Sequence, residues 1–294
     1  MPNSRKPRKS ELQSTYFVQD RRKKEEFTRL TIQDHMITTS MGGVLPEQPD
    51  PTIFHHALDV ACGTGGWAIE AAKVYPSMSL VGIDISERMI HYARELAKTE
   101  QVSDHVEFHV MDALYTLEFA PASFDLVNLR LGVSFVRTWD WPNLVEEFKR
   151  ITRQGGIIRL TECDAAESNS PSQRRFADLL HQALYNAGNC FRPQHDGLTS
   201  ELAPLLIRHG LGNVQTQEHI LTYRAGTPES RLFAEDTQYL FQMLRPFIQK
   251  WTRLPEDYDA LYHQALTEMQ QADFVATWKF VTAWGSTKVS GEAH

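Results

Sequence analysis

One stretch near the start of the chain, His56–Ala72 (HALDVACGTGGWAIEAA), constrains the fold more than any other. Its first residues, Ala57–Val60, predict a short buried strand, and its last, Trp67–Ala72, predict the start of a helix. Three glycines lie between them: Gly63, Gly65 and Gly66. A strand that passes through a glycine turn into a helix leaves unpaired backbone N–H groups, and these bind an anion. The stretch therefore predicts a site for a nucleotide-like cofactor.

Strands and helices alternate after this stretch. Apolar runs predict strands at 79–84, 106–110, 124–129 and 157–163, and 3.6-residue periodicity predicts helices at 87–98 and 141–152. Beyond residue 170, the pattern predicts helices at 172–187 and 200–209, a strand at 213–223, two or three helices within 228–271, and a final strand at 274–284. This alternation of strands and helices predicts an α/β protein with a parallel, doubly wound sheet.

Four segments are expected along the chain: a disordered basic leader over 1–12, an N-terminal helical segment over 13–50, a cofactor-binding core over 51–165, and the C-terminal half of the sheet over 166–294. The last segment carries helical lid insertions at about 170–210 and 225–272. Because the second insertion is dense in Phe, Tyr and Trp, it either encloses an apolar or aromatic ligand or serves as extra core or a dimer surface.

Charge and cysteine content exclude several classes of protein. A net charge of −7 and a pI near 5.9 argue against a nucleic-acid partner, since phosphate binding depends on clustered Lys and Arg. No apolar run reaches the roughly 18 residues that span a membrane. Cys62, Cys163 and Cys190 are too scattered for a disulfide framework or a zinc site. We therefore expect a cytoplasmic protein without a metal, whose oligomeric state stays open, a homo-oligomer included.

Three acidic residues lie within, at the end of, or just after predicted strands: Asp59, Asp84 and Asp112. In a parallel sheet the carboxyl ends of the strands face one crevice, so these carboxylates can converge on one ligand above the glycine turn. Asp84 follows the glycines by about 20 residues, the spacing of an acid that binds a ribose diol. Asp112 is placed to bind an adenine amino group, with Met89 and Met111 as walls for the ring.

In this order and spacing, LDVACGTGG, LVGIDIS, VMDAL, FDLVNLRL and RITRQGGIIRLTE resemble the motifs of the class I S-adenosylmethionine-dependent methyltransferases. The resemblance covers roughly residues 55–163. It implies an enzyme that uses S-adenosyl-L-methionine and a Rossmann-like sheet of seven strands, the last antiparallel. Ala61 stands where the family usually has its first glycine, and Gln154 stands where a proline commonly precedes Gly-Gly.

The motifs and the resemblance together predict the site residues. For the cofactor these are Tyr16, Asp59, Ala61, Gly63, Gly65, Asp84, Ile85, Met89, Met111, Asp112, Ala113, Asn128 and Leu129. For the substrate they are Arg130, Phe135 and Trp139, and for catalysis His181, Glu162 and Tyr185. Each has a structural alternative: Tyr16 can staple a helix to the core, Arg130 can pair with Glu162, His181 can be a core histidine, and Trp139 can serve packing alone.

The expected function is methyl transfer to a small, apolar or aromatic acceptor in secondary metabolism. The N-terminal helix, the aromatic lid and the closing VTAWG strand resemble small-molecule methyltransferases of bacterial natural-product pathways, including the teleocidin-pathway C-methyltransferase. The sequence leaves open whether carbon, oxygen or nitrogen is methylated and whether a general base takes part. The alternatives are a methyltransferase of RNA or protein, a nicotinamide-dependent oxidoreductase, and a non-catalytic cofactor-binding protein.

Overall fold

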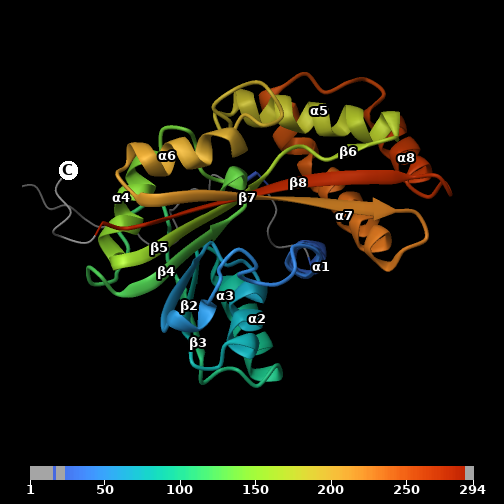
Figure 1. Ribbon diagram of the computed structural model, residues 1–294. Coiled ribbons are helices and arrows are strands. Elements are labelled where there is room, and N and C mark those ends of the chain that lie inside the picture. The colour runs from blue at the N-terminus through green and yellow to red at the C-terminus, as the bar shows by residue number, and fades with distance from the viewer. Residues whose placement is uncertain (1–15, 18–23, 289–294) are drawn as a thin grey trace, which may run out of the picture.

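One twisted sheet runs through the whole molecule, in the computed structural model, which describes residues 16, 17 and 24–288 (Figure 1). Its strands follow the order β3-β2-β1-β4-β5-β8-β6, and β7 pairs with β8. The strands are β1 (His56–Val60), β2 (Ser79–Asp84), β3 (Val106–Val110), β4 (Phe124–Arg130), β5 (Thr152–Cys163), β6 (Glu167–Ser168), β7 (Gly212–Arg224) and β8 (Val275–Ser286). The predicted basic leader, 1–12, lies outside the described residues.

The direction of the strands confirms the predicted sheet. The first five strands pair in parallel, and β8 pairs antiparallel with both β5 and β7. The sheet therefore has seven long strands with the last one antiparallel, as the resemblance implied. One strand was not predicted: β6, whose Glu167 and Ser168 pair with Thr277 and Ala276 of β8. Two residues carry no hydrophobic period, so the sequence gives no signal for such a strand.

Helices cover both faces of the sheet. They are α1 (Lys24–Ser40), α2 (Gly66–Val74), α3 (Glu87–Thr99), α4 (Trp141–Ile151), α5 (Pro171–Asn186), α6 (Leu202–Arg208), α7 (Pro228–Trp251) and α8 (Tyr258–Glu268), with short 3₁₀ turns at Pro51–Ile53, Gly132–Ser134 and Thr199–Glu201. The aromatic region after residue 228 thus folds as two helices, one of the two numbers that the sequence allowed.

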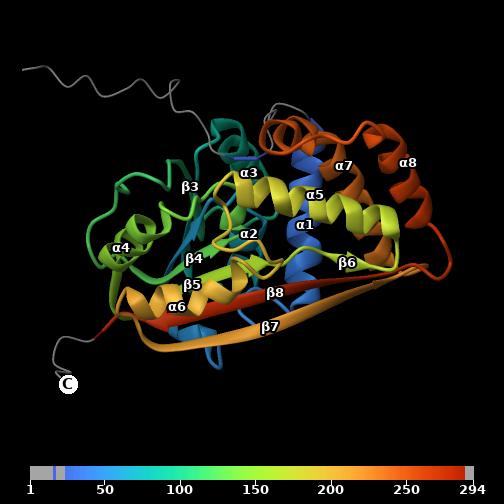
Figure 2. The same ribbon diagram turned by 90° about the horizontal axis from the view of Figure 1, so that it is seen from above.

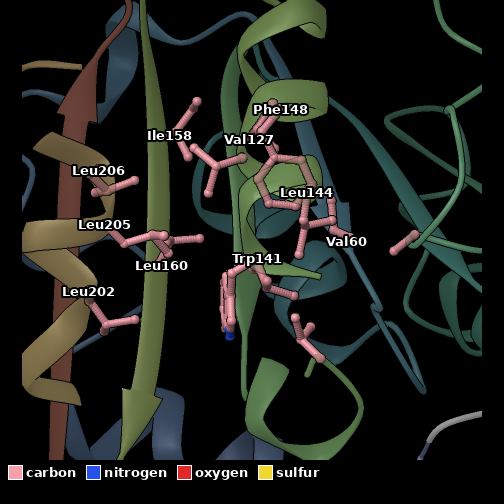
Figure 3. Close-up of a cluster of buried hydrophobic side chains, with 14 of the residues drawn as sticks. Val60, Val127, Trp141, Leu144, Phe148, Ile158, Leu160, Leu202, Leu205 and Leu206 are labelled. Carbon is pink, nitrogen blue, oxygen red and sulfur yellow. The ribbon is translucent and has the colours of Figure 1, made fainter. Parts of the chain in front are cut away.

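Apolar side chains fill both sides of the sheet. On one side Trp141, Leu144 and Phe148 of α4, together with three leucines of α6, pack on β4 and β5 (Figure 3). On the other side α2 and α3 pack through residues such as Trp67 and Ile90 on β1, β2 and β3. Two buried faces explain why β1 and β4, in the middle of the sheet, are buried along nearly their whole length, whereas β3 at the edge alternates buried and exposed residues.

The remaining helices build a separate layer. Figure 2 shows α1, α5, α7 and α8 grouped above the part of the sheet where β7 ends and β8 begins. Phe176 of α5 stacks on Phe241 of α7 with ring centroids 4.0 Å apart, and Tyr258 of α8 meets the Phe176 ring edge-on. These aromatic residues form a hydrophobic core of their own, so the predicted lid is a packed helical layer. None of the helices in the described part of the chain is long and apolar enough to cross a membrane.

A row of buried polar side chains crosses the sheet. Asp59, Asn128 and Arg159 are register partners on β1, β4 and β5. Asn128 donates to Asp59 Oδ1 over 2.8 Å, and Arg159 Nη1 donates to Asn128 Oδ1 over 2.8 Å. At the far end, Arg159 binds both carboxylate oxygens of Glu47 at 2.7 and 3.1 Å. We call these four residues the polar row.

Breaking the polar row is expected to destabilise the fold strongly. Arg159→Met leaves the Glu47 carboxylate, which has no exposed side-chain surface, without its partner. Loss of one partner of a buried ion pair costs about 3–5 kcal/mol. Urea unfolding of the full chain measures this loss. The matched control Arg175→Met breaks an exposed ion pair with Asp257 and should cost less than about 1 kcal/mol; equal losses in the two variants would contradict the assignment.

Candidate active site

A cavity lies between the carboxyl ends of the central strands and the helical layer. One wall comes from the ends of β1, β2, β4 and β5 and the loops that follow them, and the opposite wall comes from α1, α5 and α7. Parallel strands place ligands in this position, because their carboxyl ends and the following loops open toward one crevice. The cavity therefore joins the predicted cofactor region to the predicted lid.

The glycine turn forms the floor of this cavity and is built as the sequence predicts. Gly63 and Gly65 have φ of +54° and +79°, and Ala61 has φ of +55°. The positive φ at Ala61 explains why a glycine is favourable there, since a Cβ strains this conformation. Ala61 and Gly63 line the cavity but Gly65 does not. A Cβ on Gly65 would come within 2.7 Å of the Phe108 ring, so its missing side chain serves helix packing.

The three predicted carboxylates Asp59, Asp84 and Asp112 all line the cavity. Asp84 accepts hydrogen bonds from the backbone N–H of Ser86 at 2.7 Å and of Gly63 at 3.1 Å, which ties β2 to the glycine turn. Asp112 accepts from the backbone N–H of Leu114 at 3.0 Å. The other predicted cofactor residues on these loops also line the cavity: Ile85, Met89, Met111 and Ala113.

Two predicted cofactor residues lie elsewhere. Asn128 and Leu129 are fully buried within β4 and do not line the cavity. The Asn128 amide is used in the polar row, and Leu129 packs in the hydrophobic core. Their neighbour Asp59 does face the cavity, and burial raises the pKa of its carboxyl to about 7 against the lowering effect of Asn128 and Arg159. Of the cofactor residues predicted within β1 and β4, only Asp59 therefore faces the cavity.

Tyr16 lines the cavity and is also bound to α1, so its structural alternative is confirmed and its cofactor contact stays a prediction. Its hydroxyl donates to Glu26 Oε1 at 2.8 Å and accepts from Arg29 Nη2 at 2.9 Å. Its ring stacks on Phe17, and the Phe17 N–H donates to the Ser134 carbonyl at 2.9 Å. Through these contacts the segment lies across α1 and reaches the loop after β4.

Arg130 lines the cavity, but its predicted alternative partner was wrong. Its guanidinium pairs with Asp34 of α1 and donates to Thr38 Oγ1 at 3.0 Å, and the Glu162 carboxylate is held elsewhere. Burial and the nearby Arg159 lower the pKa of Arg130 to about 9. A Cβ on Gly66 would overlap the Asp34 carboxylate, so Asp34 lies against the N-terminus of α2. The pair joins α1 to the cofactor side of the cavity.

The predicted catalytic residues are spread out. His181 lines the cavity, with Nε2 3.1 Å from the Pro193 carbonyl, and burial lowers the pKa of its ring. Glu162 is completely buried beneath the loop after β4, where it accepts from the Val133 N–H at 3.2 Å. Burial raises the pKa of Glu162 to about 8. Tyr185 is 40% exposed and lies outside the cavity lining, so of the three only His181 can touch a ligand there.

Of the two aromatic residues predicted to contact substrate, one lines the cavity. Phe135 lies in its wall. Trp139 is 65% exposed and packs against Gly188, where a Cβ would come within 2.5 Å of the indole. The sequence could not separate the two, because both lie in one irregular loop without a period.

The sequence reasoning missed several polar residues that line the cavity, among them Arg29, Gln33 and Asp236. Arg29 and Gln33 lie on α1 and approach Asp236 of α7, more than 200 residues away. The spacing of residues within one segment cannot predict a contact between residues so far apart in the sequence. In the described residues, no group of three or more His, Cys, Asp or Glu side chains is arranged to hold a metal ion.

Comparison with known proteins matches this architecture to a family. Residues 57–156 match the model of a methyltransferase domain. The demethylmenaquinone methyltransferase of Lactococcus lactis subsp. lactis (strain IL1403) is 34% identical over 102 residues, which cover 34% of this chain and 39% of that enzyme. The match thus spans about two fifths of that relative.

Two other proteins align over more of the chain. The 27-O-demethylrifamycin SV methyltransferase of Amycolatopsis mediterranei (strain S699) is 27% identical over 241 residues, which cover 82% of this chain and 74% of the relative. The structure of Haemonchus contortus phosphoethanolamine N-methyltransferase 2, solved with phosphomonomethylethanolamine and S-adenosylhomocysteine, aligns with a TM-score of 0.55 and 19% identity, over 93% of this chain and 60% of that one.

The glycine turn, the carboxylates at successive strand ends and the sheet order agree with the matched domain. Residues 57–156 therefore match a methyltransferase domain, within a fold similar to that of a methyltransferase solved with S-adenosylhomocysteine.

Proposed function

We propose that this protein transfers the methyl group of S-adenosyl-L-methionine to a small acceptor with an apolar or aromatic body. One observation carries the proposal: a single cavity extends from the glycine turn and Asp84 to the apolar side chains of the helical layer. A methyl donor bound at the strand ends and an acceptor bound under the helices would then share one enclosed space.

The cofactor end of the cavity fits S-adenosylmethionine. We expect Asp84 to bind the ribose hydroxyls, Asp112 the adenine amino group, and Met89 and Met111 the faces of the ring, and the lining of the cavity by all four residues supports these roles. Gly63 gives the amino-acid end of the cofactor close access to backbone, since a Cβ there would occupy the space before Leu30. When bound, the cofactor supplies an electrophilic methyl group on a positively charged sulfur.

The acceptor end is lined largely by apolar side chains. They come from the helical layer and from β8: Ala177, Leu180, Leu184, Phe233, Leu240, Phe241, Trp278 and Phe280. Such a lining removes water and aligns the acceptor with the methyl group, and an in-line displacement depends on this alignment. Aromatic faces also stabilise the positive charge of a sulfonium. The enclosed lining and the net charge of −7 favour a small acceptor over RNA or a protein surface.

Two relatives support the acceptor class by their names. One is a demethylmenaquinone methyltransferase and the other a 27-O-demethylrifamycin SV methyltransferase, so both are named for methyl transfer to compounds that are not macromolecules. We further propose a role in secondary metabolism and a cytoplasmic location, which the aromatic layer and the lack of a membrane-spanning helix among the described residues support.

Binding of the product nucleoside tests the cofactor. S-adenosylhomocysteine at about 100 times its dissociation constant should stabilise the chain by about 2.7 kcal/mol, which raises the melting temperature by about 5 °C. Differential scanning fluorimetry with S-adenosylhomocysteine and, separately, with NADH measures the shift. A shift with NADH alone would identify an oxidoreductase, and a shift with neither would remove the cofactor assignment.

The carboxylate of Asp84 should contribute much of this affinity. Asp84→Asn removes the charged acceptor for the ribose hydroxyls, and such hydrogen bonds contribute about 1.5–3 kcal/mol. We therefore expect calorimetry to show S-adenosylhomocysteine binding weakened by about 10- to 100-fold. Asp104→Asn, which makes the same change at an exposed loop position, is the matched control and should bind normally. Unchanged affinity of Asp84→Asn would place the ribose elsewhere.

A further inference from the structure

A group of polar side chains interrupts the apolar lining of the cavity where α1 meets α7. It consists of Arg29, Gln33 and Asp236, and we call it the polar corner. Arg29 and Asp236 are 1% and 2% exposed, so both charges are removed from water except through the cavity. Buried charges are costly unless they are paired, and here the pairing is uneven. The polar corner therefore needs an explanation beyond stability.

The hydrogen bonds of Arg29 show this unevenness. Its guanidinium binds both oxygens of Glu26 at 2.8 and 3.0 Å, whereas its contact with Asp236 Oδ1 is 3.4 Å long. Gln33 Nε2 lies 3.5 Å from Asp236 Oδ2. Strong charge-assisted hydrogen bonds are about 2.7–2.9 Å long. Asp236 is thus held in place by weak contacts, and its oxygens keep the capacity to accept a shorter hydrogen bond from a ligand in the cavity.

The position of α1 brings the polar corner close to the methyl donor. Leu30 lies 3.9 Å from the place where Gly63 would carry a Cβ, and Asp34 lies against Gly66. Arg29 and Gln33 immediately precede these two residues on α1 and turn toward α7 instead. About the width of one helix, roughly 10 Å, therefore separates the glycine turn from Asp236. A cofactor held by Asp84 and the glycine turn would therefore lie in the same cavity as the polar corner.

We propose that Asp236 accepts the proton of a hydroxyl group on the methyl acceptor, with Arg29 and Gln33 as the residues that position its carboxylate. The acceptor is then an apolar molecule that carries a phenol, enol or alcohol group. The acceptor oxygen forms its bond to the methyl carbon as the bond from that carbon to sulfur breaks. The bonding pair stays on sulfur, and the hydroxyl proton moves to Asp236. This inference rests on the proposed methyl transfer.

The charges around the polar corner favour a hydroxyl over the other acceptor groups. A carboxylate on the acceptor would be repelled by Glu26 and Asp236. A protonated amine would be attracted by these carboxylates, but it has no lone pair with which to attack the methyl carbon. A neutral hydroxyl donates to Asp236 without adding a charge to the buried site. His181, the competing base, has its Nε2 at 3.1 Å from the Pro193 carbonyl, so this nitrogen is occupied by the loop.

The ionisation of Asp236 gives the proposal a pH dependence. Burial raises the pKa of this carboxyl to about 6; Arg29 and Gln33 lower it, and Glu26 raises it. The other titratable side chains that face the polar corner are Tyr16 from the N-terminal segment and Tyr223 from β7. Because a base must be unprotonated, turnover should be half-maximal near the pKa of about 6, rise to its plateau roughly one pH unit higher, and fall at lower pH.

The test uses the full chain and three bicyclic probes of one shape: 1-naphthol, 1-naphthylamine and 1-methylnaphthalene. Their binding is measured by fluorescence titration with S-adenosylhomocysteine present, above pH 7. We expect 1-naphthol to bind about tenfold or more tightly than 1-methylnaphthalene, the effect of one hydrogen bond to a charged group. Asp236→Asn should abolish this preference. Asp259→Asn, the same change at a 73% exposed position of α8, should keep it.

Turnover provides a second reading. Asp236→Asn should lower methylation of 1-naphthol by about 100-fold or more while it retains affinity for S-adenosylhomocysteine. It should also lose the acidic limb of the pH profile. Gln33→Leu removes a contact that positions the Asp236 carboxylate and lowers its pKa, so it should move that limb to higher pH. This variant keeps the carboxylate and decides the question even if Asp236→Asn does not fold.

Three results would overturn the proposal: equal binding of 1-naphthol and 1-methylnaphthalene, an unchanged preference in Asp236→Asn, or an acidic limb that is lost in His181→Gln and stays at the same pH in Gln33→Leu. Methylation of 1-naphthylamine alone would also overturn it and leave methyl transfer standing. Failure of S-adenosylhomocysteine to bind the wild-type chain would instead refute the proposed function itself.

Discussion

The polar row is the interaction on which the rest of the site depends. Asp59, Asn128 and Arg159 lie in register on three parallel strands. Arg159 donates a hydrogen bond to Asn128, and Asn128 donates one to Asp59. At one end Arg159 fixes Glu47, in the loop whose Val44 carbonyl accepts the indole N–H of Trp67. At the other end Asp59 enters the cavity. The row therefore links the cofactor floor to α2 through a loop on the far side of the sheet.

A second connection depends on α1, which serves both halves of the cavity. Its Asp34 joins Arg130 and the start of α2, and its Arg29 joins Asp236 of the helical layer. One rigid helix thus fixes the distance between the cofactor side and the acceptor side. Tyr16 adds to the same connection, since its hydroxyl lies between Glu26 and Arg29. Movement of α1 would change both sides together.

The elements of the sheet could be predicted because their signals are local. Residues 79–84 end at Asp84 and residues 106–110 are followed by Asp112, and the strands have these same bounds. The glycine turn was equally clear, although the contribution of Gly65 to packing against Phe108 was hidden, since it depends on a neighbouring strand. The same reasoning was wrong for Asn128. Its position near a strand end predicted contact with a ligand, but its amide is hydrogen-bonded within the polar row.

The acceptor side could not be predicted in the same way, because its residues meet only through tertiary packing. Asp236 lies within a helix whose sequence is indistinguishable from an ordinary amphipathic one, and its carboxylate becomes unusual only when α1 covers it. Burial then does two things at once. It raises the pKa of Asp236 toward neutrality, and it removes the water that would otherwise solvate a reacting oxygen. Asp84 and Asp112, which hydrogen-bond to backbone N–H groups at the strand ends, are only partly buried and suit binding. The same residue type thus lines both ends of one cavity, with Asp236 buried at the helical end and Asp84 and Asp112 partly exposed at the strand ends.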